Sequence, residues 1–347
     1  MNPLFKDKRI LVTGACGTVG KELIHQLLGN HKAGELIGID NNESELFFLE
    51  DEFAEFKNCS FFLADVRDRD KIFRKMKYMN IVFHTAAFKH VILCERSPFE
   101  AVQTNILGIQ NIINAAIENK VERVIFTSSD KAVNPTNVMG ASKLMGERLM
   151  AAANSNSRDG GPIFTSTRFG NVLGSRGSVI PIFREQIRHG GPVTLTDAAM
   201  TRFIMSLEEA IRLVIESAGH AVGGEVFITK MPAIRIQDLA EVMVRELALR
   251  YEFSPQDIEI KTIGSKPGEK LYEELMNEEE IRRAWELKQY FVVLPAYGSI
   301  YRKTDYQYAN VISKTVSKPY NSGNHPLLSR KDLSDFLHIH DLLRESR

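Results

Sequence analysis

Three neighbouring residues, Ser129, Asp130 and Lys131, carry side chains suited to acid–base chemistry. A carboxylic acid beside an amine can donate one proton and accept another, which is what the elimination of water requires. Asp and Lys side chains in contact normally hold their ionised forms, so this chemistry needs burial that favours both neutral forms. Met139 and Lys143 follow one helical turn apart and therefore share a helix face. These five residues predict a catalytic site. The simpler alternative is that Asp130 and Lys131 form only an ion pair at the surface.

A glycine-rich segment near the N-terminus has the spacing of a dinucleotide-binding turn. It joins a predicted strand at 9–13 to a predicted amphipathic helix at 19–28. Glycines there let the backbone approach a pyrophosphate, and the helix N-terminus attracts the phosphate charge. The residues expected to contact the cofactor at this turn are Gly14, Gly17, Thr18, Val19 and Gly20.

Asp40 ends the next predicted strand and favours NAD over NADP. A carboxylate at this position accepts hydrogen bonds from ribose hydroxyls and repels a 2′-phosphate. No Arg or Lys occurs at 41–45 to offset that repulsion. Asp65 is expected to meet the adenine edge, or else to cap its own loop. The further cofactor contacts expected after the third and fourth strands are Asp65, Val66, Thr85, Ala86 and Ala87.

Apolar runs of strand length alternate with helical periodicity through the first half of the chain. This alternation predicts an α/β fold with a doubly wound parallel sheet of the Rossmann type. After about residue 170, turn-rich segments and shorter helices predict a smaller α/β substrate domain. We expect a first domain at 1–170, with a segment near 200–230 returning to it, and a discontinuous second domain within 171–347. The further predicted strands are 36–40, 60–64, 81–85 and 123–128, and the further predicted helices are 104–119, 206–218 and 236–250.

Composition excludes several classes of protein. The 347 residues include 44 basic and 44 acidic side chains, so net charge favours neither nucleic acid nor an anionic membrane as a partner. Three cysteines without a CxxC pair predict neither a disulfide framework nor a metal site. No apolar run approaches the length of a membrane span. The sequence predicts a soluble cytoplasmic protein.

Seven ordered motifs make the chain similar to the nucleotide-sugar 4,6-dehydratases of polysaccharide and nonulosonate biosynthesis. These enzymes are extended short-chain dehydrogenases that act on UDP-N-acetylglucosamine. Most such enzymes carry Tyr at the position of Met139. A Met at this position resembles one subgroup of the family. The resemblance covers nearly the whole chain through TGACGTVG, TAAFKHV, SSDKAVNPTNVMGASK, TRFGNVLGSRGSVIPIF, TRFIM, KPGEKLYEEL and YNSGNHPLLS.

The resemblance implies oxidation of the sugar at C4 by NAD, loss of water across C5 and C6, and reduction at C6. Asp130 is then the acid at O6, Lys131 the base at C5, and Ser129 a hydrogen-bond partner of the C4 oxygen. Lys143 is expected to hold the nicotinamide ribose. Met139 lines the site but cannot accept the proton of the C4 hydroxyl. The acceptor of that proton is then either Asp130 or water relayed through Ser129. With Lys131 as the one base, retention of configuration at C5 is expected.

The same resemblance implies where the nucleotide sugar binds. Asn171 resembles a residue that contacts the diphosphate, and nearby residues add donors that suit its charge. Lys266 stands where the family usually carries Arg. Lys keeps the positive charge but lacks the two parallel N–H donors with which Arg binds a phosphate. Homodimers or higher homo-oligomers are expected, with segments 97–119 and 137–153 at the interface. The implied substrate contacts are Lys89, Asn171, Arg176, Ser178, Arg202, Lys266 and Glu269.

Three alternatives remain open. A nucleotide-sugar 4-epimerase would need the C4 oxidation but no acid–base pair for elimination, and it would normally keep the Tyr. A C5-inverting dehydratase would need a second proton donor, for which Lys89 is the first candidate. A non-catalytic NAD-sensing regulator would explain Met139 but not the Asp130–Lys131 pair.

Overall fold

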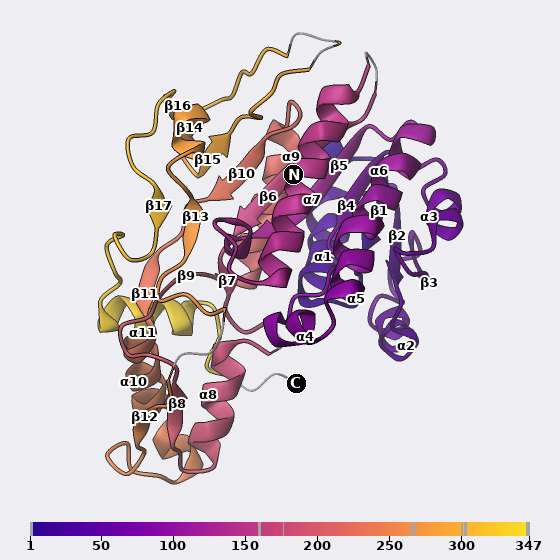
Figure 1. Ribbon diagram of the computed structural model, residues 1–347. Helices are drawn as coiled ribbons and strands as arrows, with labels where there is room; N and C mark the ends of the chain where they lie inside the picture. The colour runs from indigo at the N-terminus through magenta and orange to yellow at the C-terminus, as the bar shows by residue number, and fades with distance from the viewer. Residues whose placement is uncertain are drawn as a thin grey trace. The chain divides into compact units, whose positions relative to one another are not determined.

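The computed structural model describes residues 3–158, 161–175, 177–264, 268–299, 301 and 304–344. The chain forms two compact units, each built from three segments (Figure 1). Unit 1 consists of Met1–Phe169, Ile211–Thr229 and Met276–Pro319, and unit 2 consists of Gly170–Ala210, Lys230–Leu275 and Tyr320–Arg347.

A ten-stranded sheet forms the centre of unit 1, in the order β16-β14-β15-β10-β6-β5-β4-β1-β2-β3. The strands from β10 to β3 are all parallel to their neighbours. Their apolar runs suit a parallel sheet that helices cover on both faces. These strands are β1 (Arg9–Thr13), β2 (Glu35–Asp40), β3 (Cys59–Leu63), β4 (Ile81–His84), β5 (Arg123–Ser129), β6 (Ile163–Phe169) and β10 (Val226–Thr229).

Three antiparallel strands extend this sheet beyond β10. They are β14 (Ala284–Leu287), β15 (Tyr290–Val293) and β16 (Val311–Ser313). β15 pairs with β10 in an antiparallel register, from Val226 opposite Val293 to Thr229 opposite Tyr290. These residues fall within 171–347, the range predicted for the second domain, but they belong to unit 1 and add antiparallel strands to the predicted parallel sheet. The structure differs because such short strands are defined by pairing with a distant part of the chain, which local periodicity does not reveal.

Helices pack on both faces of the sheet. On one face Ile72, Ile112 and Met150 join the strand residues Leu11 and Val124 in one core. On the other face Thr167 Oγ contacts Ser217 Oγ at 2.7 Å, which places the helix of Ser217 there. The helices of unit 1 are α1 (Thr18–His31), α2 (Glu43–Glu52), α3 (Arg69–Lys75), α4 (Val91–Arg96), α5 (Pro98–Val102), a π-helix (Gln103–Leu107), α6 (Gly108–Glu118) and α7 (Val138–Asn156); α9 (Leu207–His220) begins in unit 2 and continues into unit 1.

Unit 2 has its own apolar core and smaller sheets. A three-stranded sheet combines β7 (Asn171–Val172), β9 (Thr201–Met205) and β11 (Ala233–Arg235), while β8 (Val193–Leu195) pairs with β12 (Ile260–Thr262). The helices are α8 (Val179–Arg188), α10 (Ile236–Leu247) and α11 (Arg330–Ile339). Their buried faces meet in a cluster that includes Ile180, Phe183, Leu239, Met243, Leu333 and Leu337.

Candidate active site

The turn between β1 and α1 requires two of its glycines. Gly14 has φ +73°, and a Cβ there would lie 2.7 Å from the backbone nitrogen of Ala86. A Cβ on Gly20 would lie 2.1 Å from Gly14 O. Gly17 is the N-cap of α1 and has no side chain to cap the helix, and Thr18 and Val19 begin it. The first N–H groups of α1 therefore keep their capacity to bind an anion such as a pyrophosphate.

The carboxylate of Asp40 is tied to this turn. Oδ2 accepts a hydrogen bond from Cys16 N at 3.1 Å, and Oδ1 accepts one from Asn42 N at 3.0 Å. A carboxylate has about four acceptor positions, so hydroxyl groups of a ligand can still bind. Asp40 thus lies where the β1–α1 turn and the end of β2 meet, as a ribose contact requires.

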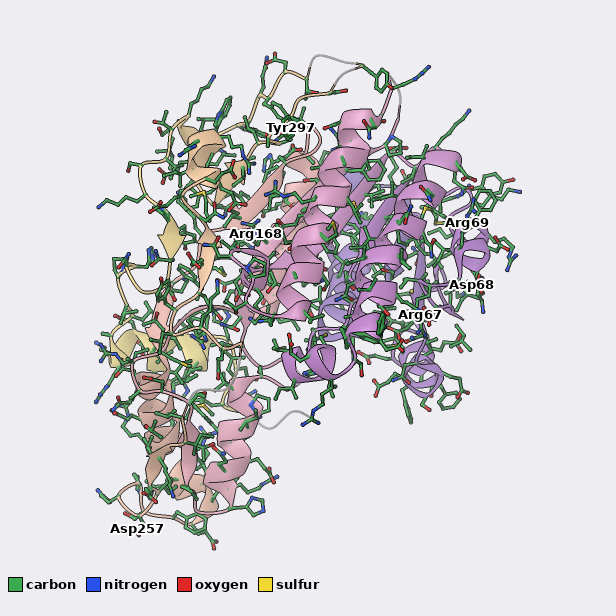
Figure 2. All side chains as sticks on the ribbon, in the orientation of Figure 1. Arg67, Asp68, Arg69, Arg168, Asp257 and Tyr297 are labelled. Carbon is green, nitrogen blue, oxygen red and sulfur yellow. The ribbon has the colours of Figure 1, made fainter. Side chains whose placement is uncertain are left out.

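Asp65 has internal partners that sequence reasoning missed. It accepts hydrogen bonds from Arg67 N at 2.9 Å, Arg67 Nε at 3.0 Å and Asn41 Nδ2 at 3.2 Å. Arg67 is the main cause that lowers the pKa of Asp65 (Figure 2). This geometry matches the loop-capping alternative, and the adenine contact of Asp65 stays a prediction. It also places the Arg67 guanidinium at the same carboxylate that Asn41 contacts, so a cation from outside 41–45 lies near Asn41. Val66 is buried.

The ends of β1 and β4 are fastened together beneath the turn. Thr85 Oγ donates to Thr13 O at 2.7 Å, and Ala86 N donates to Thr13 Oγ at 3.3 Å. Thr13 Oγ also contacts His84 Nδ1 at 2.7 Å. Burial lowers the pKa of His84 to about 3, so the ring is neutral at physiological pH. These contacts fix Thr85, Ala86 and Ala87 at the edge of the sheet that faces the glycine turn.

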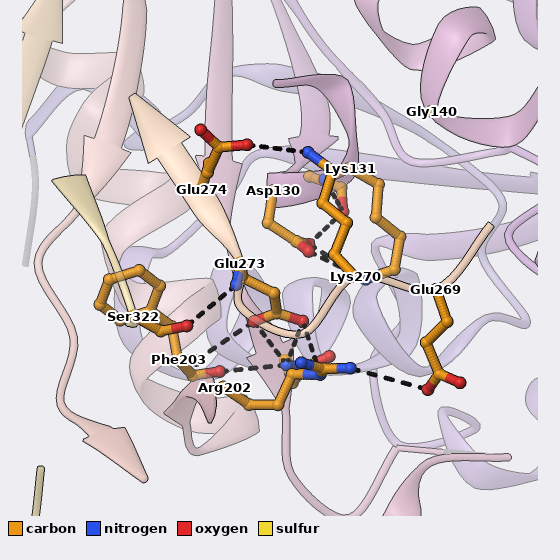
Figure 3. A network of polar contacts seen from close by, with 12 residues as sticks. Asp130, Lys131, Gly140, Arg202, Phe203, Glu269, Lys270, Glu273, Glu274 and Ser322 are labelled. Atoms are coloured by element: carbon orange, nitrogen blue, oxygen red, sulfur yellow. Dashed lines mark hydrogen bonds and ion pairs between the residues drawn. The ribbon is translucent and has the colours of Figure 1, made fainter. Parts of the chain in front are cut away.

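Ser129, Asp130 and Lys131 form a connected group at the end of β5 (Figure 3). Ser129 Oγ donates to Asp130 Oδ1 at 2.6 Å, and Lys131 Nζ lies 3.0 Å from Asp130 Oδ2. The Asp130 side chain is 3% exposed and that of Lys131 34%. A close ion pair favours the charged forms of both side chains, so Asp130 must first gain a proton if it is to act as the predicted acid.

Helix α7 presents Met139 and Lys143 beside this group. Its N-cap Asn137 accepts from Gly140 N at 2.8 Å, and a Cβ on Gly140 would lie 2.2 Å from Lys131 O. The helix therefore packs directly against the Asp130–Lys131 segment. Met139 is buried against Cys94 and Ala101.

Lys143 is buried and donates to Thr127 O at 3.0 Å. Burial lowers the pKa of Lys143 to about 8, while the charge of Glu147 raises it. Lys143 Nζ also lies 4.8 Å from the centroid of the Phe126 ring. The ammonium group is thus held close to the sheet, and a modest rise in pH would neutralise it.

A buried charge network behind α7 was not predicted. Arg168 donates to Glu147 through Nε at 2.9 Å and to Glu280 through Nη1 and Nη2, both at 3.0 Å (Figure 2). Ser128 Oγ donates to Glu147 at 2.5 Å. Arg168 is fully buried, and both carboxylates are at most 5% exposed. The network fixes β5, β6 and α7, which carry the candidate catalytic residues.

The π-helix positions the loop that carries Lys89. Asn105 is buried, accepts a hydrogen bond from Phe88 N at 2.8 Å and donates to Phe88 O at 3.0 Å. It also donates to Ser142 Oγ at 2.9 Å, which connects the loop to α7. Lys89 itself is exposed. A π-helix is a common feature of functional sites, yet the apolar pattern predicted an ordinary helix from residue 104.

Unit 2 brings together Asn171, Arg202 and Glu269, three of the predicted substrate contacts. Arg202 lies 3.6 Å from Glu269 and 3.4 Å from Glu273, which also accepts from Asn171 Nδ2 (Figure 3). Sequence reasoning missed Glu273. The N-cap of α8 is Ser178, whose buried Oγ makes no hydrogen bond with a described residue. Arg176 and Lys266 lie outside the described residues.

Neither a metal cluster nor a membrane span is found in the described part of the chain. It contains no group of three or more His, Cys, Asp and Glu residues that could hold a metal ion. It also contains no helix with the length and apolar character to cross a bilayer.

Comparison with known proteins shows the family to which this chain is similar. A model of the polysaccharide biosynthesis protein family matches residues 10–295. An uncharacterized membrane protein of Methanocaldococcus jannaschii is 54% identical over 85% of this chain and 87% of its own length. An inverting UDP-N-acetylglucosamine 4,6-dehydratase of Campylobacter jejuni is 36% identical over 96% of this chain and 98% of its own length. A UDP-glucose 4-epimerase of Rickettsia rickettsii is also 36% identical, over 99% of this chain and 98% of its own length.

The fold has a close counterpart among solved structures. The X-ray structure of Pen from Bacillus thuringiensis superposes with a TM-score of 0.88 and 41% sequence identity. The match covers 96% of this chain and 98% of that one. The chain therefore belongs to the polysaccharide biosynthesis protein family, within the extended short-chain dehydrogenase/reductase superfamily.

Proposed function

We propose that this protein dehydrates UDP-N-acetylglucosamine to its 4-keto-6-deoxy derivative, with NAD as a cofactor that ends the cycle oxidised. The observation that carries this proposal is the buried Asp130, in contact with both Ser129 and Lys131 at the end of β5. A 4-epimerase needs only the C4 oxidation, so a second acid–base pair would have no role there. The product class suits surface-glycan or nonulosonate biosynthesis.

The residues around the glycine turn fit NAD. Gly14 and Gly20 leave no room for side chains where the turn contacts Ala86 and its own backbone. The uncapped N-terminus of α1 offers N–H groups to the pyrophosphate, and Asp40 offers acceptors to the ribose. When bound, NAD would take a hydride from the sugar and return it. Lys143 would hold the nicotinamide ribose.

Asp130 can receive the C4 hydroxyl proton in place of the missing Tyr. Ser129 Oγ already donates to Asp130 Oδ1 at 2.6 Å. We propose that the C4 proton passes to Ser129 Oγ as the proton of Ser129 passes to Asp130. This transfer leaves Asp130 neutral, which is the form that can later protonate the departing O6. It also removes a negative partner of Lys131, whose side chain is 34% exposed. The Lys131 ammonium can then release its proton to solvent, and the neutral amine can act as the C5 base.

The proposal is tested by mass spectrometry of UDP-N-acetylglucosamine incubated with the protein and NAD. Loss of one water from the sugar nucleotide supports the dehydratase. An unchanged mass with a changed C4 configuration would establish the epimerase. A bound cofactor without any sugar chemistry would favour the NAD-sensing regulator.

A C5-inverting dehydratase is a second candidate, favoured by the name of the Campylobacter relative. Inversion needs a proton donor on the face opposite Lys131, and the exposed Lys89 is the first candidate. Nuclear Overhauser contacts between H3 and H5 of the product distinguish the two outcomes. Their presence supports the expected retention, and their absence supports inversion.

NAD should bind at least tenfold more tightly than NADP, because the Asp40 carboxylate would lie against a 2′-phosphate. Asp40→Asn tests the charge alone, since the amide oxygen can still accept from Cys16 N. This variant should gain NADP affinity by roughly tenfold, about 1.4 kcal/mol. Titration of both dinucleotides by calorimetry measures the effect. Equal affinities in the unmodified protein would remove Asp40 from the cofactor site.

We further propose a cytoplasmic homo-oligomer that associates through the segments around α4 to α7. Several apolar side chains there are exposed, and Phe99 is 80% exposed. Phe99→Lys should place a charge in that interface and lower the molecular mass measured by light scattering. Tyr297→Lys is a matched control because Tyr297 is 84% exposed and lies outside those segments. An unchanged mass for Phe99→Lys would exclude this surface. The other exposed apolar residues of the segments are Ile92, Leu93, Val102, Leu107, Ile117 and Met145.

A further inference from the structure

The amide of Asn171 is held in one orientation by acceptor groups of unit 2. Asn171 Nδ2 donates to Glu273 Oε1 at 2.8 Å and to Glu273 Oε2 at 2.9 Å, and it lies 3.3 Å from Phe203 O. A carboxylate and a carbonyl can only accept hydrogen bonds, so the NH₂ end of the amide must face them. The opposite end, Oδ1, receives no hydrogen bond from the described residues.

Glu273 is itself fixed and cannot easily turn away. Its carboxylate accepts from Phe203 N at 3.1 Å and lies 3.4 Å from Arg202 Nε (Figure 3). Its backbone exchanges two hydrogen bonds with Ser322, at 2.8 and 2.9 Å. The side chain is 7% exposed. Releasing Asn171 would therefore cost the buried Glu273 carboxylate one of its hydrogen-bond donors, about 0.5–1.5 kcal/mol for a typical hydrogen bond.

We propose that Asn171 offers its carbonyl oxygen to the nucleotide sugar and selects a hydrogen-bond donor of that ligand. This inference rests on the proposed function and specifies one contact within it. A diphosphate presents acceptor oxygens, so an amide in this orientation does not suit it. The diphosphate role that the sequence resemblance gave Asn171 would need the NH₂ group that Glu273 occupies. Glu273 is the positioning residue that sets this preference.

The donor can come from the sugar, through its acetamido N–H or a hydroxyl group, or from the uridine. Asn171→Leu removes the acceptor and leaves Glu273 in place. Its affinity for UDP, UDP-glucose and UDP-N-acetylglucosamine, measured by calorimetry on the NAD-loaded protein, separates these sources. A loss confined to UDP-N-acetylglucosamine identifies the acetamido group, and an equal loss for all three identifies the uridine. A loss shared by UDP-glucose and UDP-N-acetylglucosamine but not by UDP would identify a sugar hydroxyl. No loss for any of them overturns the proposal.

A paired substitution tests the orientation directly. Asn171→Asp places two carboxylates together, and Glu273→Gln places two NH₂ groups together, so each should weaken UDP-N-acetylglucosamine binding roughly tenfold or more. In the double variant the amide introduced at 273 can donate to the carboxylate introduced at 171, whose second oxygen still faces the ligand as an acceptor. Binding should then return to within about fivefold of the unmodified protein.

The opposite orientation gives the opposite result. If position 171 faced the diphosphate with its NH₂ group, the double variant would bind worst of all, because a carboxylate would repel the phosphates. Thermal midpoints of all variants show whether each remains folded. A protein that binds nucleotides in the expected pattern but leaves the mass of UDP-N-acetylglucosamine unchanged would refute the dehydratase and keep this inference. Failure of the unmodified protein to bind UDP or its sugars would refute both.

Discussion

Asp130→Asn is expected to lower the dehydration rate by roughly 10²–10⁴-fold, the range for removal of a positioned acid or base. The introduced amide has the size of the carboxylate. Its oxygen can still accept a hydrogen bond from Ser129 Oγ, which lies 2.6 Å from Asp130 Oδ1 in the unmodified protein. It cannot take a proton, so the C4 hydroxyl should stay protonated and oxidation at C4 should stop. The absorbance of reduced nicotinamide during a single turnover should therefore stay at its starting level.

Ser129 provides the matched controls for this prediction. Ser129→Thr keeps the hydroxyl and should remain within a fewfold of the unmodified rate, whereas Ser129→Ala breaks the proton route and should approach Asp130→Asn. Accumulation of reduced nicotinamide in Asp130→Asn would show that C4 is oxidised without Asp130. The carboxylate would then serve only the elimination, and water would be the acceptor of the C4 proton.

The parallel strands were predictable because burial on both faces produces continuous apolar runs. The sequence predicted strands at 9–13 and 123–128, and the structure has Arg9–Thr13 and Arg123–Ser129. β3 has a similar apolar run, yet it lies at the edge of the sheet and exposes Phe62 and Leu63. A run of apolar letters does not show which strand lies at an edge.

The groups that hold the site in place were hidden because their partners are far apart in sequence. Glu273 contacts Asn171 across 102 residues, and Glu280 contacts Arg168 across 112. Each of these residues alone reads as an ordinary surface side chain. Only residues of the site that lie within one strand end or one helix turn, such as Ser129 and Lys143, carried a local signal. The supporting partners required the tertiary structure.

Arg168→Met is expected to destabilise the protein by about 3–5 kcal/mol, the usual cost of removing one partner from a buried ion pair. Arg168 is fully buried between Glu147 and Glu280, so the variant removes the cation that contacts both buried carboxylates. Urea unfolding followed by circular dichroism would measure the loss. A decrease below about 1 kcal/mol would show that the network contributes little, as exposed ion pairs do.

The stability of the unmodified protein and that of Arg168→Met should change in opposite directions with pH. In the unmodified protein the charge of Arg168 helps hold the pKa of Glu280 below its usual value against the effect of burial. The Arg168–Glu280 pair stabilises the folded protein at pH values above the pKa that Glu280 has in the unfolded state. This stabilisation is lost as the pH falls. Without Arg168, burial should raise the pKa of Glu280, so the folded state binds more protons than the unfolded state and stability should fall as pH rises from 5 to 8. Neutralising both carboxylates in Arg168→Met/Glu147→Gln/Glu280→Gln should recover most of the loss and remove this dependence, because no unpaired charge then remains buried.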